Sequence, residues 1–300
     1  MSQSVMINDV GPRDGLQNQS RILTPDQRLK LIRALNLAGV ERVEVGAFVS
    51  PKAVPAMAGT DLLLDALAGE KGTYSVLIPN MKGYELATAA GADTVVMVLY
   101  GSEGMAQANV NRSRAQIEQV TEQILVEAMQ DDVRVIVTIA VSFECPFDGP
   151  VEPLGILEMA EKFLDKGAAE VVIADTIGAA NPAQVRSMTE KLLERHDFER
   201  IACHFHDTRA MGLANVFAAL ESGVRKFDSS IGGLGGCPFA PGASGNVATE
   251  DVVMMVEQIG FDTGIDQLKL AKASQIAAEL TGNVPGARAK LWLNRHLGIV

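Results

Sequence analysis

The sequence predicts an α/β protein built as a single (β/α)8 TIM barrel with a short C-terminal helical extension. Three observations lead to this prediction: eight short β-branched runs alternate with segments of helical period, glycines close several helices just before the next run, and polar residues recur where the runs end. A chain of 300 residues that is 47% hydrophobic can bury one large core. We therefore expect one domain over residues 1–300, with the barrel at about 1–260 and the extension at 261–300.

The eight runs are expected to be the barrel strands. In chain order they cover residues 5–9, 42–47, 74–79, 94–100, 133–142, 170–175, 200–206 and 226–230. Each run is followed by a loop, and most are then followed by an amphipathic segment. Their spacing of roughly 20 to 40 residues is what successive βα units require.

The residues expected to start and end helices support the same architecture. Thr24-Pro25-Asp26 and Asn181-Pro182 are typical helix starts, because each places a capping side chain directly before proline. Four glycines end helices shortly before the next strand, as αβ loops of a barrel do, at Gly39, Gly91, Gly167 and Gly223. Beyond Gly260 the pattern is helical, most clearly over residues 265–280.

Charge and targeting signals narrow the class of partner. The formal net charge of −11 is spread without basic patches, which argues against nucleic acid and anionic membranes and favours a small-molecule partner. Three cysteines, Cys145, Cys203 and Cys237, are too few and too far apart for a disulfide framework. With no leader peptide and no apolar stretch of membrane-spanning length, we expect a soluble, cytoplasmic protein. The sequence allows a homo-oligomer but does not fix the oligomeric state.

The most specific chemical feature is the pair His204 and His206. Side chains two apart on a strand project to the same face, so both imidazoles are expected to point into the mouth of the barrel, whereas Cys203 points away. Asp14, after the first strand, supplies a third metal ligand and Asn246 a fourth. This mixed nitrogen and oxygen set suits a divalent cation, Mg²⁺ or Mn²⁺ before zinc.

Other residues at strand ends are candidates for catalysis. Arg13 is placed to stabilise developing negative charge on an enolate or carboxylate. Glu44 and Asp175 either orient neighbouring groups or transfer protons themselves, and the sequence leaves both roles open. Cys237 lies in the Gly/Pro-rich segment 232–246, where a nearby cation would lower the pKa of its thiol. We therefore favour a catalytic thiol over a buried structural one.

Several motifs together resemble the hydroxymethylglutaryl-CoA lyase family. They are residues 10–18 (VGPRDGLQN), 48–52 (FVSPK), 79–83 (PNMKG), 175–178 (DTIG), 204–208 (HFHDT), 232–239 (GGLGGCPF) and 242–251 (GASGNVATED). The resemblance implies that Asp14, His204, His206 and Asn246 hold the metal and that Cys237 acts on a loop. It also implies cleavage of 3-hydroxy-3-methylglutaryl-CoA to acetyl-CoA and acetoacetate in leucine degradation. Lys52, Asn80 and Lys82 are the candidate CoA contacts, because they lie in family-like loops.

Three segments depart from the family's usual pattern. Arg209 adds a cation after the second histidine, Glu44 is followed by Val-Gly-Ala, and Glu144 replaces a usual glycine. These changes keep a different branched 3-hydroxyacyl-CoA open as an alternative substrate. A condensing acyl-CoA synthase is less favoured, since that group has Glu where Leu16 stands.

Overall fold

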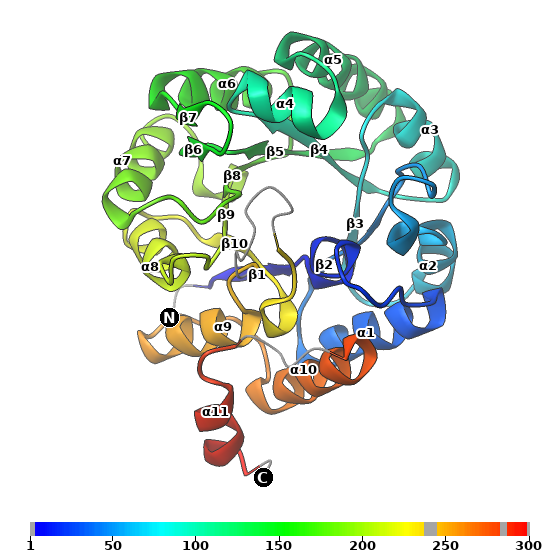
Figure 1. Cartoon of the computed structure of the whole chain (residues 1–300), viewed down its shortest axis with the longest axis vertical. Coiled ribbons are helices and arrows are strands. Elements are labelled where there is room, and N and C mark those ends of the chain that lie inside the picture. Colours follow the sequence, from blue (N-terminus) through cyan, green and yellow to red (C-terminus); the bar gives the residue numbers. More distant parts are fainter. Residues whose placement is uncertain (1–3, 237–244, 283–286, 299–300) are drawn as a thin grey trace.

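The computed structural model describes residues 4–236, 245–282 and 287–298, and it shows a closed barrel of eight parallel strands surrounded by helices (Figure 1). The order around the barrel is β1-β10-β9-β8-β5-β4-β3-β2. The strands are β1 Met6–Asp9, β2 Arg42–Ala47, β3 Thr73–Leu77, β4 Thr94–Tyr100, β5 Arg134–Ala140, β8 Glu170–Asp175, β9 Ile201–Phe205 and β10 Lys226–Ser229. This confirms the TIM barrel, and each predicted run contains one strand to within two residues at either end.

Helices follow the strands and form the outer layer. They are α1 Pro25–Ala38, α2 Thr60–Leu67, α3 Met81–Ala89, α4 Glu103–Val110, α5 Arg114–Asp131, α6 Pro153–Asp165, α7 Pro182–Leu193, α8 Gly212–Glu221, α9 Thr249–Gln258, α10 Gln267–Thr281 and α11 Lys290–His296. Short helical turns are η1 Gly11–Gly15, η2 Pro55–Met57, η3 Phe198–Arg200 and η4 Ile231–Gly233. None of the helices among residues 4–236, 245–282 and 287–298 is long and apolar enough to cross a membrane.

The predicted helix starts form as capping boxes. The Thr24 hydroxyl accepts a hydrogen bond from Gln27 N, and Asn181 caps α7 in the same way. Gly39 ends α1 with φ 96°, a conformation that glycine adopts without strain. A two-stranded hairpin, β6 Glu144–Cys145 and β7 Gly149–Pro150, follows β5 and was not predicted.

Strand register identifies the side chains that point into the barrel. Asn8 is paired with both Arg42 and Asp228, and Asp228 with His204, so these residues share the inner face. The middle of the interior is an apolar layer of Val96, Ile136, Val172 and Ala202, each at most 7% exposed.

Below that apolar layer lies an ion cluster made of Arg42, Glu170 and Lys226. Glu170 Oε2 is 3.0 Å from Arg42 Nη1 and 2.7 Å from Lys226 Nζ. The three side chains come from β2, β8 and β10 and are at most 14% exposed. We call them the lower ion cluster. With the apolar layer above them, they fill the end of the barrel where the strands begin, which leaves the opposite end, the mouth, for a functional site.

In the C-terminal extension α10 packs on the barrel, whereas α11 contacts α10 and projects away from the barrel (Figure 1). α10 lies against α1 at the lower right of the ring of helices in Figure 1. The segment before α11 is attached to the start of α9, because the carboxylate of Asp251 accepts hydrogen bonds from Arg288 N and Ala289 N at 2.7 and 2.9 Å. The guanidinium of Arg288 also pairs with Asp207 at 3.1 Å.

Candidate active site

The first functional side chains are presented by η1, a π-helical turn that follows β1. Val10 O accepts hydrogen bonds from the backbone N–H groups of Arg13, Asp14 and Gly15. The turn packs so closely on its neighbours that a Cβ on Gly11 would lie 2.7 Å from Asp9 Oδ1. Glycine is therefore required there for η1 to hold Arg13 and Asp14 at the mouth.

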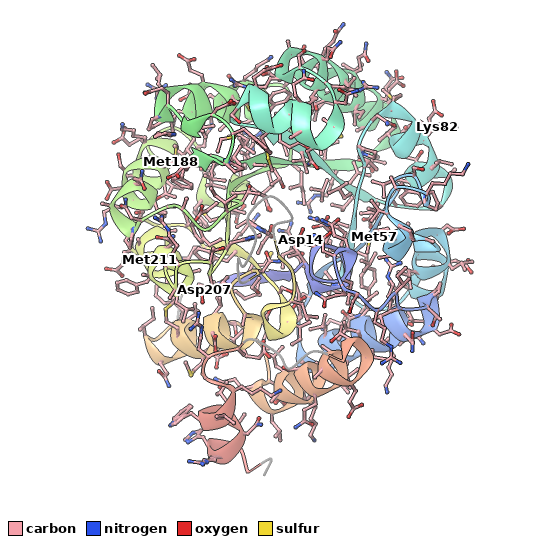
Figure 2. All side chains as sticks on the ribbon, in the orientation of Figure 1. Asp14, Met57, Lys82, Met188, Asp207 and Met211 are labelled. Carbon is pink, nitrogen blue, oxygen red and sulfur yellow. The ribbon has the colours of Figure 1, made fainter. Side chains whose placement is uncertain are left out.

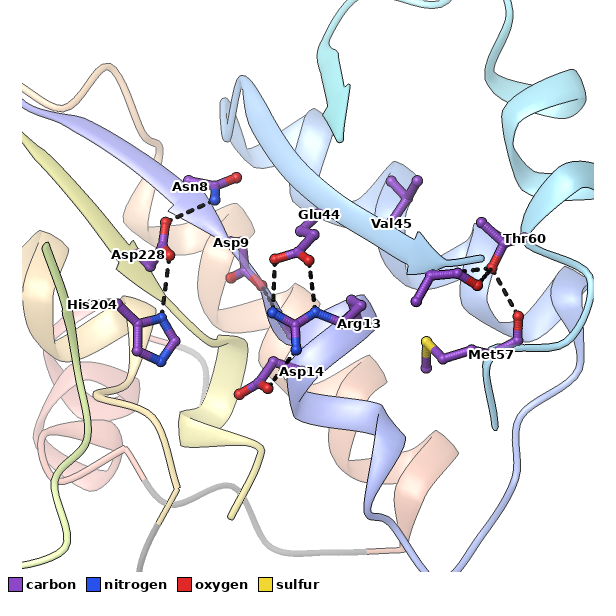
Figure 3. A network of polar contacts seen from close by, with 12 residues as sticks. Asn8, Asp9, Arg13, Asp14, Glu44, Val45, Met57, Thr60, His204 and Asp228 are labelled. Carbon is purple, nitrogen blue, oxygen red and sulfur yellow. Dashed lines mark hydrogen bonds and ion pairs between the residues drawn. The ribbon is translucent and has the colours of Figure 1, made fainter. Parts of the chain in front are cut away.

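Arg13 is fixed by two carboxylates. Its Nε and Nη2 donate to the two oxygens of Glu44 at 2.7 and 3.1 Å, and its Nη1 donates to Asp14 Oδ1 at 2.7 Å (Figure 3). Burial alone would lower the pKa of Arg13, but Glu44 and Asp14 outweigh that effect and raise it. The result is a permanently charged guanidinium held in one orientation.

Asp14 meets the two histidines of β9. One potential ligand atom from each of Asp14, His204 and His206 lies within 4.8 Å of the other two, as a metal site requires. Burial would raise the pKa of Asp14, but Arg13 and the two histidines lower it to about 2. Burial lowers the pKa of His206 to about 4, so this imidazole is neutral near neutral pH, as a metal ligand must be.

The ring of His204 is oriented by an acid that the sequence analysis did not identify. His204 Nδ1 lies 3.2 Å from Asp228 Oδ2, and Asp228 Oδ1 accepts a hydrogen bond from Asn8 Nδ2 at 2.8 Å (Figure 3). Because a carboxylate accepts hydrogen bonds, Nδ1 is the protonated nitrogen, and Nε2 keeps its lone pair for a ligand. The two imidazoles lie 5.2 Å apart between ring centroids.

Asn246 completes the group. Its amide nitrogen donates to Asp14 Oδ2 at 2.7 Å and to Leu234 O at 3.0 Å, and its backbone forms a bridge with His206. Two buried atoms, Asn246 Oδ1 and His206 Nδ1, have no hydrogen-bond partner among the described residues. Unpartnered buried polar atoms are costly, and here they lie beside a carboxylate and a second imidazole. The residues present therefore fit a divalent cation.

Asp175 lies on the other face of its strand. It is paired with Phe205, one residue away from the inward-facing His204, and its oxygens accept hydrogen bonds from Ala179 N and Ala180 N at 2.7 and 3.1 Å. Burial raises the pKa of Asp175 to about 6. The structure thus makes Asp175 the anchor of the loop after β8 and does not place it in the group around Asp14.

Arg209 holds the same loop from the other side. Its Nε donates to Gly178 O at 2.9 Å, and its Nη2 donates to Ala179 O. The guanidinium of Arg209, the additional positive charge in the sequence, is thus hydrogen-bonded to backbone carbonyls.

The three predicted CoA contacts lie in the loops after β2 and β3 and at the start of α3. Lys82 pairs with Glu85 at 2.8 Å, and Figure 2 shows it on the outer perimeter, whereas Asp14 lies at the centre. Asn80 caps α3 by accepting a hydrogen bond from Gly83 N, and Lys52 is exposed in the loop after β2. Cys237 lies outside the described residues.

A second buried acid, Asp9, was also missed. It is fully buried, and its oxygens accept hydrogen bonds from Gly11 N at 2.8 Å and Thr249 Oγ1 at 2.7 Å. It therefore joins the start of η1 to the start of α9, three residues after Asn246. Burial raises the pKa of Asp9 to about 7. The sequence signal for Asp9 was weak, since a single acid at a strand end also fits an exposed loop.

Comparison with known proteins identifies the family. Residues 4–277 match the HMGL-like family. The chain belongs to the HMGL-like family. This HMGL-like chain is 41% identical to the (R)-citramalyl-CoA lyase of Chloroflexus aurantiacus, over 96% of this chain and 95% of that protein. It is 40% identical to the hydroxymethylglutaryl-CoA lyase of Pseudomonas mevalonii, over 97% of each.

A solved structure agrees with the sequence comparison. The hydroxymethylglutaryl-CoA lyase of Pseudomonas aeruginosa superposes on this HMGL-like chain with a TM-score of 0.93 and 38% identity, over 99% of both chains. The family and these relatives make the chain a carbon–carbon lyase.

Proposed function

We propose that this chain cleaves 3-hydroxy-3-methylglutaryl-CoA to acetyl-CoA and acetoacetate, with Mg²⁺ or Mn²⁺ as cofactor, in leucine degradation. The observation that carries the proposal is the group at the mouth, where Asp14, His204 and His206 converge beside Arg13. Two buried atoms beside them have no hydrogen-bond partner within residues 4–236, 245–282 and 287–298. This arrangement supplies a cation site and a fixed positive charge next to each other. Cleavage next to a thioester needs both, because an alkoxide and then an enolate develop.

Each residue has a distinct task in this reaction. Asp14, His204, His206 and Asn246 would hold the cation, which when bound polarises the hydroxyl and a carbonyl or carboxylate oxygen of the substrate. A neighbouring base takes the hydroxyl proton, the C2–C3 bond breaks, and its electron pair moves into the thioester enolate. Arg13, held by Glu44, would stabilise that enolate oxygen. Protonation at C2 then gives acetyl-CoA, with Cys237 as the proposed acid.

A second candidate substrate is citramalyl-CoA, which is favoured by the relative at 41% identity. Both substrates are 3-hydroxy-3-methyl thioesters that end in a carboxylate, and they differ by one methylene before that carboxylate. Cleavage of citramalyl-CoA would give acetyl-CoA and pyruvate. The identities of 41% and 40% do not separate the two, so the substrate must be measured.

The test is acetyl-CoA release from each thioester, with Mg²⁺, with Mn²⁺ and after EDTA treatment. His206→Gln removes one proposed ligand, and His296→Gln is the matched control because His296 lies on α11 and stacks on Trp292. We expect metal-dependent turnover that is lost in His206→Gln and Cys237→Ser and retained in His296→Gln. Faster cleavage of citramalyl-CoA would reassign the substrate. If neither thioester is cleaved, the proposal is wrong.

A further inference from the structure

Three neighbouring side chains on the inner face of β3, β4 and β5 are partly exposed. Leu77, Val98 and Thr138 lie on β3, β4 and β5, and each is only half-buried. Register places them on the inner face, because Leu77 pairs with Val96 and Val98 pairs with Thr138, and Val96 belongs to the apolar layer of the interior. We call these three residues the acyl wall.

Solvent reaches the acyl wall through the mouth of the barrel. The residues two positions earlier on the same strands and on the same face are buried: Val96 is 5% exposed, Ile136 is 7% exposed and Ser75 is 4% exposed. The lower ion cluster fills the barrel still further down. A side chain above these layers can therefore meet solvent only through the mouth, where substrate enters.

The acyl wall lies directly across the barrel from the candidate active site. In the strand order, β5 is four places from β1, β4 is four places from β10, and β3 is four places from β9. Of those opposite strands, β1 leads to Asp14, β10 carries Asp228 and β9 carries His204. Figure 1 shows β4 and β5 on the side of the barrel away from β1. A molecule bound beside Asp14 and His204, which we call the Asp14 side, thus has its other side facing the acyl wall.

We propose that the acyl wall determines which substituent a substrate can carry at C3, and that it selects a small one such as methyl. This inference rests on the proposed function. An acyl group held at its oxygens by the Asp14 side must direct its C3 substituent toward the opposite wall. Val98 is the central member, between β3 and β5, and its branched side chain limits the space. One methylene in an apolar pocket changes kcat/KM by roughly 10- to 200-fold, so a single wall residue can set the preference.

The experiment compares kcat/KM for a 3-methyl and a 3-butyl 3-hydroxyglutaryl thioester of CoA. Val98→Ala enlarges the site and should raise the butyl-to-methyl ratio about tenfold or more, whereas Val98→Phe should lower it. Val96→Ala is the matched control, since Val96 lies on the same strand and face but in the buried layer. It should lower thermal stability and leave the ratio unchanged. Leu77→Ala is a second enlarging variant in case Val98→Ala does not fold.

A binding measurement tests the acyl wall independently of catalytic turnover. The same ratio is measured by calorimetry with 3-methyl- and 3-butylglutaryl-CoA, which lack the hydroxyl and cannot be cleaved. If the enzyme cleaves neither thioester but Val98→Ala still shifts the binding ratio, the proposed function fails and the acyl wall stands. If Val98→Ala and Leu77→Ala change both substrates equally in turnover and binding, the acyl wall does not select the substituent, and the inference is overturned.

Discussion

Replacing Glu44 with glutamine tests whether Arg13 is the group that stabilises the enolate. Glu44 Oε1 and Oε2 accept hydrogen bonds from Arg13 Nε and Nη2 at 2.7 and 3.1 Å. Glutamine has nearly the same shape, but one oxygen becomes an NH2 group that faces an N–H donor. One of the two hydrogen bonds is lost and the negative charge disappears, while the bond from Arg13 to Asp14 remains.

The size of the effect follows from burial. The side chain of Glu44 is 3% exposed and that of Arg13 is 12% exposed, so water cannot replace the missing acceptor. Breaking a buried ion pair costs about 3–5 kcal/mol, and the remaining contact with Asp14 puts this case at the lower end. Removing one donor to a developing oxyanion lowers kcat by about 10²- to 10³-fold. Because Arg13 is displaced but not deleted, we expect kcat to fall about 100-fold.

The control is Glu170→Gln in the lower ion cluster. Glu170 is as buried as Glu44 and is paired with Arg42 and Lys226, but it lies at the far end of the barrel. Both variants should lower the melting temperature, whereas only Glu44→Gln should lower kcat by much more than about threefold. Steady-state acetyl-CoA release and thermal unfolding are measured on both. Equal losses of kcat would show that the two variants act through stability alone and would refute the role given to Arg13.

Three further perturbations have distinct readouts. Asp228→Asn removes the acceptor that orients His204 and should weaken Mn²⁺ binding by about 10- to 100-fold in calorimetry; unchanged affinity would contradict that role. Asp9 has a pKa raised from 3.8 to about 7, so the folded state keeps its proton longer than the unfolded state, and stability falls as pH rises through this range. The loss is about 4 kcal/mol, and Asp9→Asn should remove this slope from urea unfolding measured between pH 4 and pH 8. Gly11→Ala places a Cβ 2.7 Å from Asp9 Oδ1 and should cost about 1–3 kcal/mol of stability; a neutral result would show that η1 can shift.

The sequence predicted the barrel well because its strands have a clear local signal. Each strand is a β-branched run with a helical segment after it, and the capping boxes at Thr24 and Asn181 mark helix starts without knowledge of the tertiary structure. The hairpin β6–β7 has two residues in each strand, which is too short for any period to be read. It forms within the loop after β5.

The site was predicted where alternation along one strand was enough. His204 and His206 are two residues apart, so they share a face whichever face that is. Asp228 is also two residues from Lys226, but one strand's alternation does not show which face points inward. The inward direction of Asp228 follows only from its pairing with His204. Asp175 shows the same limit, because its outward direction follows from its pairing with Phe205.

The CoA contacts Lys52, Asn80 and Lys82 stay predictions, because the local sequence pattern does not encode the direction of a loop. Lys82 is two residues beyond the cap Asn80, and the rotation of α3 turns it outward to Glu85. A cytoplasmic location stays a prediction from the sequence, which also leaves the oligomeric state open.

The lower ion cluster has a consequence for the order of events in catalysis. Since that end of the barrel is filled by Arg42, Glu170 and Lys226, cation, substrate and products all pass through the same opening. Whatever binds last covers whatever bound first. A cation bound beside His204 and His206, as proposed, would therefore arrive before the thioester and stay until the products depart, so saturating substrate should slow its removal by a chelator.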